Sequence, residues 1–281
     1  EETIARRRSP ITKEMFVEMA NLTCDSDPNS ATSVTFDWLA LGRILGLRVA
    51  EYAQTTQNKV DAYEYASGNK VIKAFIPTDW KFFNEKGRLM TADDLLEGDK
   101  AMPKKLKVTF RIQKNRENGQ SITLAADDKN HHICPVRAAH RIYLRAKCLG
   151  QSDNQPMGVF VNHQGIVRYL TANKIAEVFQ SVAKTCHPDL TRDENMRFSS
   201  HSIRVWAVVL LDEAGMNPDF IKSRLRWMGD SYRLYLRDTA ILQTKHITAL
   251  ERSSYDFMAL FGENRMALPD IVPVDDAMVS Y

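Results

Sequence analysis

The segment from residue 197 to residue 218 constrains the fold most, because its pattern predicts one apolar helix with polar residues gathered at its start. The run VWAVVLL at 205–211 is apolar on every side, as in a helix that is buried. Ser199 or Ser200 can cap it by accepting a hydrogen bond from a first-turn amide. Gly215 can end it in a left-handed conformation. Asn217 and Pro218 then predict the cap and first residue of another helix.

A histidine and an arginine stand at the start of this helix. His201 and Arg204 are three residues apart, so they share one helix face and can address a single object. The alternative is that both are first-turn polar residues in water. The rest of the sequence has to decide between these two interpretations.

Length and composition set the class of protein. The chain has 281 residues, of which 44% are hydrophobic, enough to bury the core of one large domain or two small ones. No apolar run approaches the roughly 20 residues needed to span a bilayer, and no signal peptide is visible. The sequence begins with Glu1, so we interpret 1–10 as a linker from an upstream region.

The cysteines and histidines give little support for a metal site. Cys24, Cys134, Cys148 and Cys186 show no paired spacing, which favours reduced thiols in an intracellular compartment. The HHIC run at 131–134 offers ligand types, but no second ligand pair follows at a zinc-like spacing. We expect neither a metal nor another cofactor.

Positive charge is concentrated in one block. Residues 100–147 hold twelve lysines and arginines against three acidic residues, whereas 263–281 holds one arginine against four acidic residues. A block of this kind favours a polyanionic partner, because each neutralised phosphate releases counterions. A solvated helix face explains the arginines within it almost as well. Three of these arginines recur every fourth residue and are candidates for contacts with a nucleic-acid backbone: Arg137, Arg141 and Arg145.

The remaining periodicity predicts mostly helices with a small sheet. Thr12 can cap a first helix, and a second is predicted over about 33–54, with Arg48 and Glu51 three residues apart on one side. The alternating LKVTFRIQ at 106–113, the NG turn and SITL predict a β-hairpin with Lys114 at its tip. Further elements are predicted as a short strand at 70–76 and helices at 135–148 and 171–185.

Together these motifs resemble the catalytic domain of tyrosine recombinases. GLRVAE, a hairpin lysine, HSIR, a tryptophan and a following tyrosine occur in the family's order, from about Ile11 to Arg237. CPVRA at 134–138 and RWMGDSYRLYLR at 226–237 resemble more particularly the Crypton and DIRS-like recombinases of eukaryotic mobile elements. The resemblance implies the DNA breaking-rejoining fold, α+β and mainly α with a small antiparallel sheet. We expect this domain over 11–262, followed by an acidic tail at 263–281.

The resemblance also implies an activity, with a role for each matching residue. The family joins DNA through a 3′-phosphotyrosine link without metal or high-energy cofactor. Arg48 and Arg204 match its two arginines, whose planar forks bind two phosphate oxygens at once. His201 would take or share the proton of the nucleophile, and the indole N–H of Trp227 would donate to the phosphate.

The supporting positions follow from the same resemblance. Lys114 matches the hairpin lysine that protonates the leaving 5′ oxygen, with Lys107 as the reserve, and Glu51 would orient Arg48. Tyr232 and Tyr235 both follow Trp227. The family's spacing of eight or nine residues selects Tyr235 as the nucleophile, with the reverse assignment as the alternative.

The expected partner is double-stranded DNA, with self-association on it, and neither a membrane nor a small-molecule substrate. The eukaryotic resemblance implies the nucleus. Three other functions stay open: a type IB topoisomerase with the same chemistry, a helix-turn-helix binding module over 210–227, and a domesticated recombinase that binds DNA without cutting it.

Overall fold

The structure is a computed structural model that describes residues 8–57, 59–96, 102–113 and 118–236. These residues belong to the first of two units, Glu1–Leu236; the second, Arg237–Tyr281, lies outside the described residues, as does most of the predicted linker. The predicted domain bounds therefore stay predictions. The helices are α1 (Lys13–Cys24), α2 (Ala31–Leu45), α3 (Ala92–Leu96), α4 (Pro135–Cys148), α5 (Ala172–Cys186), α6 (Arg192–Asn195), α7 (Ser202–Glu213) and α8 (Pro218–Leu225).

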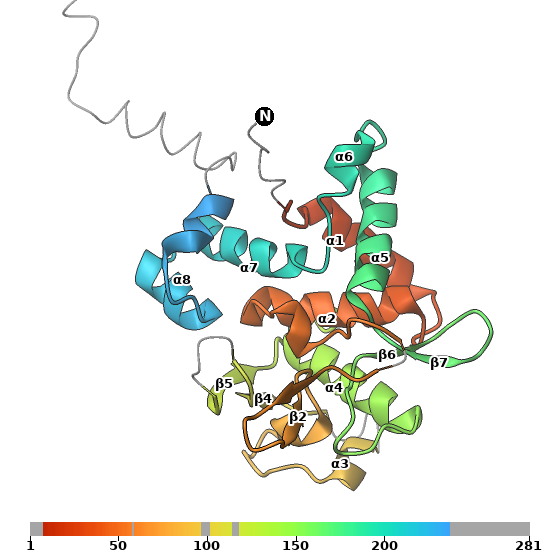
Figure 1. The fold of residues 1–281 in the computed structure, drawn as a ribbon, viewed down its shortest axis with the longest axis vertical. Coiled ribbons are helices and arrows are strands. Elements are labelled where there is room, and N and C mark those ends of the chain that lie inside the picture. Colours follow the sequence, from red (N-terminus) through yellow and green to blue (C-terminus); the bar gives the residue numbers. More distant parts are fainter. Residues whose placement is uncertain (1–7, 58, 97–101, 114–117, 237–281) are drawn as a thin grey trace, which may run out of the picture. The chain divides into compact units, whose positions relative to one another are not determined.

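Helix α2 organises the core. Its sequence, ATSVTFDWLALGRIL, carries only two charged residues, Asp37 and Arg43, and most of its side chains are buried. A helix that is apolar on nearly every side is stable only when other elements surround it. Contacts with α1, α4, α5 and α7 provide that surrounding. Figure 1 shows α2 in the middle of the fold, with α7 above it and α4 below.

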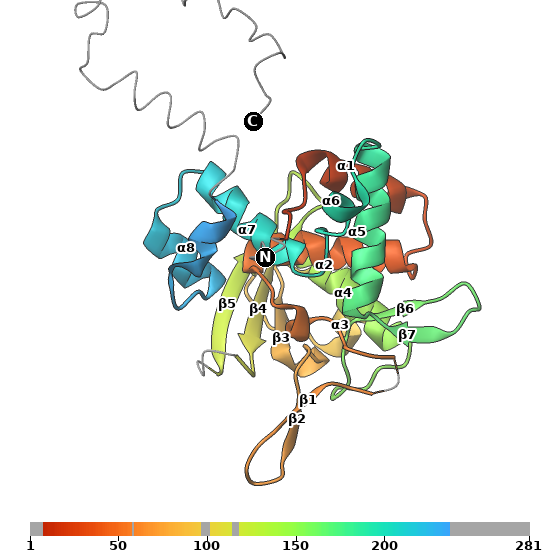
Figure 2. The same ribbon diagram turned by 45° about the horizontal axis from the view of Figure 1, so that its top comes forward.

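Three small antiparallel sheets complete the described part of the fold. The largest has the order β3-β4-β5, formed by Trp80–Phe83, Lys105–Phe110 and Gln120–Ala125. Val108 lies opposite both Trp80 and Ile122, so alternate residues of β4 face the core. The other sheets are the hairpins β1-β2 (Ala62–Glu64 and Lys70–Ile72) and β6-β7 (Val159–Val161 and Val167–Tyr169). Figure 2 shows β1-β2 extending away from the helices.

Most of the predicted elements are confirmed. The fold is α+β and mainly α, and the helices at 135–148 and 171–185 are present within one residue. The β-hairpin is also present, but its first strand ends at Phe110, three residues before the predicted end. Thr12 caps α1, and Asn217 caps α8 with Pro218 as its first residue. The strand predicted at 70–76 is shorter, ending at Ile72.

The second predicted helix ends nine residues earlier than expected. It stops at Leu45 because Gly46 adopts a left-handed conformation, with φ 55° and ψ 50°. Arg48 and Glu51 therefore do not lie on the face of a long helix. Arg48 is the N-terminal cap of a separate 3₁₀ turn, η1 (Val49–Glu51), and Glu51 is the last residue of that turn.

The start of α7 also differs from the prediction. His201, in right-handed helical backbone conformation, is the N-cap residue, and neither Ser199 nor Ser200 caps the helix as predicted. Ser199 instead accepts a hydrogen bond from the His201 amide, and its own amide donates to the Ser202 hydroxyl. The Ser199–Ser202 bond closes the turn that precedes the helix.

The three regularly spaced arginines of α4, Arg137, Arg141 and Arg145, do not form one solvent-exposed row. Arg141 Nε and Arg145 Nη2 each donate to Asp37 of α2, at 2.6 Å. The Arg145 guanidinium is buried and also donates to the Pro28 carbonyl. Arg145 thus packs α4 on α2, and its charge is compensated inside the protein, contrary to a role on a DNA backbone. Arg137 is partly exposed and remains available for one.

Gly46 gives the first prediction. A Cβ at this position would lie 2.9 Å from Leu225 Cδ2 and 3.2 Å from Leu225 Cβ, so a side chain would push α8 away from the end of α2. Gly46→Ala should lower the free energy of unfolding by about 1 kcal/mol for the left-handed backbone and about 1–3 kcal/mol more for the overlap. Urea unfolding measures the total.

Gly150→Ala is the matched control. Gly150 has a φ of 80°, and a Cβ there would meet nothing within 4 Å, so only backbone strain applies. Equal losses in the two variants would show that the Gly46–Leu225 contact does not position α8.

Candidate active site

A hollow of about 500 Å³ brings together most of the predicted site residues. Its walls come from the start of η1, the start of α7, the end of α8 and the 3₁₀ turn η4 (Asp230–Tyr235). These segments are far apart in sequence, and packing of α7 against α2, α8 and η4 places them side by side. The lining residues are Arg48, Val49, His201, Arg204, Arg226, Trp227, Met228, Gly229, Ser231 and Tyr235.

Arg48 is held by contacts on two sides. Its Nη2 donates to the Arg226 carbonyl at 2.9 Å, and its Nη1 lies 3.4 Å from Glu51 Oε1 and 3.4 Å from Gln113 Oε1. The Arg48 backbone amide donates to Glu51 Oε2 at 2.8 Å. Glu51 therefore contacts Arg48 as the sequence predicted, although through a turn rather than along a helix.

Arg204 lies in the first turn of α7 and is almost fully buried. Its Nη1 donates to the Gly46 carbonyl, and its guanidinium carbon lies 4.2 Å from the centroid of the Trp227 ring. Burial, followed by the charges of Arg48 and Arg226, lowers the pKa of Arg204 to about 9, so the group stays charged at neutral pH. A bound anion would relieve this repulsion between cations.

His201 contacts Tyr235 directly. His201 Nε2 and the Tyr235 hydroxyl are 2.9 Å apart. Burial, then the charges of Arg204 and Arg8, lowers the pKa of His201 below its usual value, which favours the neutral imidazole. In the tautomer with a free Nε2 lone pair, the Tyr235 hydroxyl donates to that nitrogen. The pair thus has the geometry for proton transfer from a tyrosine nucleophile.

The indole of Trp227 packs near Arg204, Tyr232 and Tyr235. Its Nε1 is buried and has no hydrogen-bond partner among the described residues. A buried N–H without a partner costs about 1–3 kcal/mol, so a ligand oxygen in the hollow would stabilise it. Tyr232 packs beside the indole, with ring centroids 6.4 Å apart, and is fully buried. Tyr232 does not line the hollow, whereas Tyr235 does.

Two residues of the site were missed by sequence reasoning. Arg226 donates to both carboxylate oxygens of Glu51, at 2.7 and 3.0 Å, and Gln113 Oε1 lies 3.3 Å from Arg226 Nη1. The sequence signal was weak, because Arg226 adjoins Trp227 but stands in a basic run, RLRW, that also fits a solvated helix end. Gln113 gave no signal beyond its place at the end of the predicted strand.

The hairpin lysine is not placed. Lys114 lies outside the described residues, so its predicted role stays a prediction. The reserve candidate, Lys107, is exposed on β4 opposite Lys81 and Thr123, and does not line the hollow.

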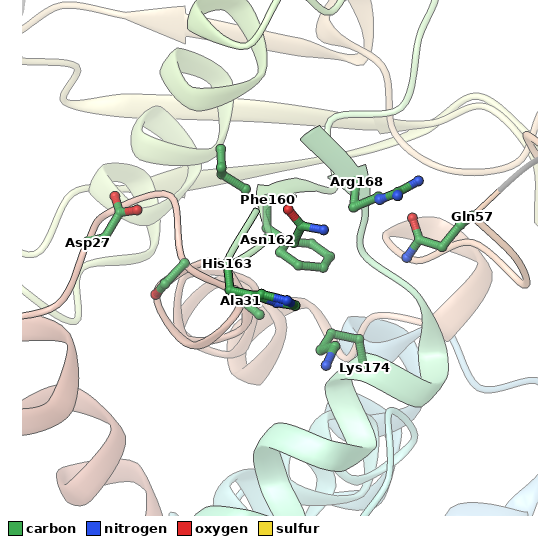
Figure 3. A pocket seen from close by; sticks show the side chains of 10 residues that line it. Asp27, Ala31, Gln57, Phe160, Asn162, His163, Arg168 and Lys174 are labelled. Atoms are coloured by element: carbon green, nitrogen blue, oxygen red, sulfur yellow. The ribbon is translucent and has the colours of Figure 1, made fainter. Parts of the chain in front are cut away.

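Two other hollows among the described residues contain none of the predicted catalytic residues. One of about 750 Å³ lies among the starts of α2 and α5 and the β6-β7 hairpin, and Figure 3 shows Arg168, Lys174 and Gln57 around it. Lys174 is paired with Glu177. Another, of about 400 Å³, includes Arg137 and three histidines of the basic block: His131, His132 and His140.

Neither metal ligands nor membrane spans are found in the described part of the chain. No group of three or more His, Cys, Asp or Glu side chains there could hold a metal ion. In the HHIC run, His132 is instead within hydrogen-bond distance of Thr23 Oγ1 and the Ala20 carbonyl. The helices among these residues are too short or too polar to cross a bilayer.

Comparisons with known proteins add a distant likeness. No protein-family model matches the chain, and no curated protein matches it. Among solved structures, the Tn1549 transposon integrase in complex with transposon right-end DNA is similar over 90% of this chain and 68% of that one, with 10% identity and a TM-score of 0.44. The same integrase with a circular-intermediate DNA has 10% identity and a TM-score of 0.41, over 89% and 68%. With both TM-scores under 0.5, the chemistry of this site rests on its own geometry.

The His201 environment gives a second prediction. Because burial and Arg204 disfavour the imidazolium, an NMR titration of the His201 ring should show a midpoint below the ordinary value of about 6.5. The His201 imidazole is then harder to protonate in the folded protein than in the unfolded chain. This histidine's contribution to stability should therefore be complete above about pH 6.5 and be lost as the pH falls through the folded-state pKa. A midpoint at or above 6.5 would contradict the burial and charge described for this site.

Proposed function

We propose that this protein cleaves and rejoins DNA strands through a tyrosine–phosphate intermediate, as a tyrosine recombinase. One observation carries the proposal. The Tyr235 hydroxyl, in contact with His201, shares a hollow with Arg48, Arg204 and an indole N–H that has no hydrogen-bond partner among the described residues. A nucleophile, its base and several anion donors are the parts that attack on a phosphodiester needs.

The chemistry follows from these positions. Tyr235 Oη would attack the phosphorus as its proton passes to His201 Nε2, forming the Oη–P bond. The bond from phosphorus to the 5′ oxygen would break, and that oxygen would take a proton, for which Lys114 is the candidate donor. Attack by a 5′ hydroxyl on the phosphotyrosine reverses the sequence. Each step exchanges one phosphate ester for another, so no external energy source is needed.

The arginines would act mainly on the transition state. Negative charge grows on the non-bridging oxygens during attack, so donors fixed around them stabilise the transition state more than the ground state. Arg48 and Arg204 supply planar forks, and Trp227 supplies its N–H. Double-stranded DNA is the proposed substrate. Self-association on DNA, a nuclear setting and a Crypton- or DIRS-like origin complete the proposal, and rest on the sequence resemblance alone.

The third prediction separates the two tyrosines. Wild-type protein incubated with a pool of nicked duplexes of random sequence should give a covalent protein–DNA band on a denaturing gel, also with chelator present. Tyr235→Phe should abolish the band by removing the nucleophile. Tyr232→Phe should keep it, because Tyr232 does not line the hollow and its buried ring is retained.

Three results would count against the proposal. A band lost in Tyr232→Phe and kept in Tyr235→Phe would reverse the assignment. A band that disappears with chelator would contradict charge stabilisation by the arginines and indole alone. Absence of a band from the wild type would remove the proposed activity.

A further inference from the structure

The backbone of Arg226 is unusual. It is the C-cap of α8, with φ 59° and ψ 48°, and is the one non-glycine with positive φ among the described residues. Glycine is the usual residue at such a left-handed cap, because a side chain there costs about 1–2 kcal/mol. An arginine persists in this conformation when other contacts compensate for that cost.

The side chain of Arg226 makes those contacts. Its guanidinium is fully buried, donates to both oxygens of Glu51, and stacks on the Phe110 ring with its carbon 3.5 Å from the centroid. Its Nη2 also lies 3.3 Å from the Leu45 carbonyl. These contacts tie the end of α8 to the end of α2, to η1 and to β4.

The left-handed turn lets one residue hold Arg48 in two ways. The Arg226 carbonyl accepts directly from Arg48 Nη2, while its side chain fixes Glu51, which accepts from Arg48 Nη1 and from the Arg48 amide. The next residue along the chain is Trp227, which enters the hollow. Arg226 thus positions both the Arg48 guanidinium and the Trp227 indole.

We propose that Arg226 is a positioning residue, which acts on the phosphate through Arg48 and Trp227 rather than by binding the phosphate itself. This inference rests on the proposed function. Its guanidinium has no exposed surface. Its Nη atoms are engaged by Glu51 and the Leu45 carbonyl, and its Nε is buried without a hydrogen-bond partner among the described residues. Arg48, by contrast, keeps about a fifth of its side chain exposed and can meet a ligand.

Arg226→Lys tests the inference, because it keeps the charge and loses the fork. At saturating nicked DNA, the rate of covalent product formation should fall about tenfold to a hundredfold, as expected when a catalytic group shifts by about 1 Å. The DNA concentration that gives half the maximal rate should change by less than about threefold, since affinity is spread over many phosphate contacts. A purely structural role would instead lower the amount of active protein and leave the rate per active molecule unchanged.

Arg111→Lys is the matched control. Arg111 also holds a buried carboxylate, Asp79, and a backbone carbonyl, that of Ala74, but it does not line the hollow. Both variants should lose thermal stability, and only Arg226→Lys should lose rate. Equal rates in the two variants would overturn the inference while leaving the proposed function intact.

Glu51→Gln gives a second measurement if Arg226→Lys does not fold. Gln keeps the shape of Glu51 but weakens the bonds to both arginines. It should reduce the rate at saturation in the same way, and unchanged kinetics would overturn the inference. Where both single variants fold, the double variant should be no slower than the slower single one, because both act on Arg48 through one contact.

If the wild type forms no covalent product, the proposed function is removed, but the positioning role of Arg226 can still be tested. Affinity for inorganic sulfate, measured by calorimetry, then reports how well Arg48 and Trp227 are placed. Weaker binding in Arg226→Lys than in Arg111→Lys would support positioning. Equal binding, or no binding to the wild type, would overturn it.

Discussion

The site depends on the hydrogen bonds that Arg48 and Arg226 donate to the buried carboxylate of Glu51. This carboxylate accepts hydrogen bonds from Arg226, from the Arg48 amide and from the Arg48 guanidinium, and so joins segments that are 175 residues apart in sequence. Breaking such a buried pair by removing one partner typically costs about 3–5 kcal/mol, because the remaining charge is left uncompensated. The position of η1 is therefore coupled to that of the end of α8. The same coupling links Arg48 and Trp227, the residues that these two segments present to the hollow.

Positive charge exceeds negative charge around the hollow. Arg48, Arg204 and Arg226 face a single carboxylate among the described residues, and the lowered pKa of Arg204 reflects burial first and then the repulsion from the other two arginines. The same conditions favour a neutral His201. A site that holds excess positive charge and an uncharged base is suited to an anion attacked by a neighbouring hydroxyl. Stability alone would favour more acidic partners, so we interpret the imbalance as functional.

Sequence reasoning reached much of this site because its residues lie in recognisable local patterns. His201 and Arg204 share the first turn of an apolar helix, and Tyr235 follows Trp227 at a fixed spacing. What it missed depends on contacts between distant segments. Nothing in the sequence near residue 226 shows that an arginine adopts a left-handed conformation and reaches Glu51. Arg145 was misjudged for a related reason, since its regular spacing on α4 gives no sign of Asp37 on α2. Periodicity also extended α2 past Gly46, where glycine ends the helix and creates the turn that presents Arg48.

The central claim is that one tetrahedral anion fits among Arg48, Arg204 and Trp227. Crystals soaked in tungstate and measured for anomalous scattering test it most directly, because tungstate resembles phosphate in shape and charge and is located without ambiguity. The account predicts an anomalous peak in this hollow within hydrogen-bond distance of both guanidinium groups and of Trp227 Nε1, and its loss in Arg204→Leu. An empty hollow in crystals that bind tungstate elsewhere, such as beside Arg168 and Lys174, would contradict it.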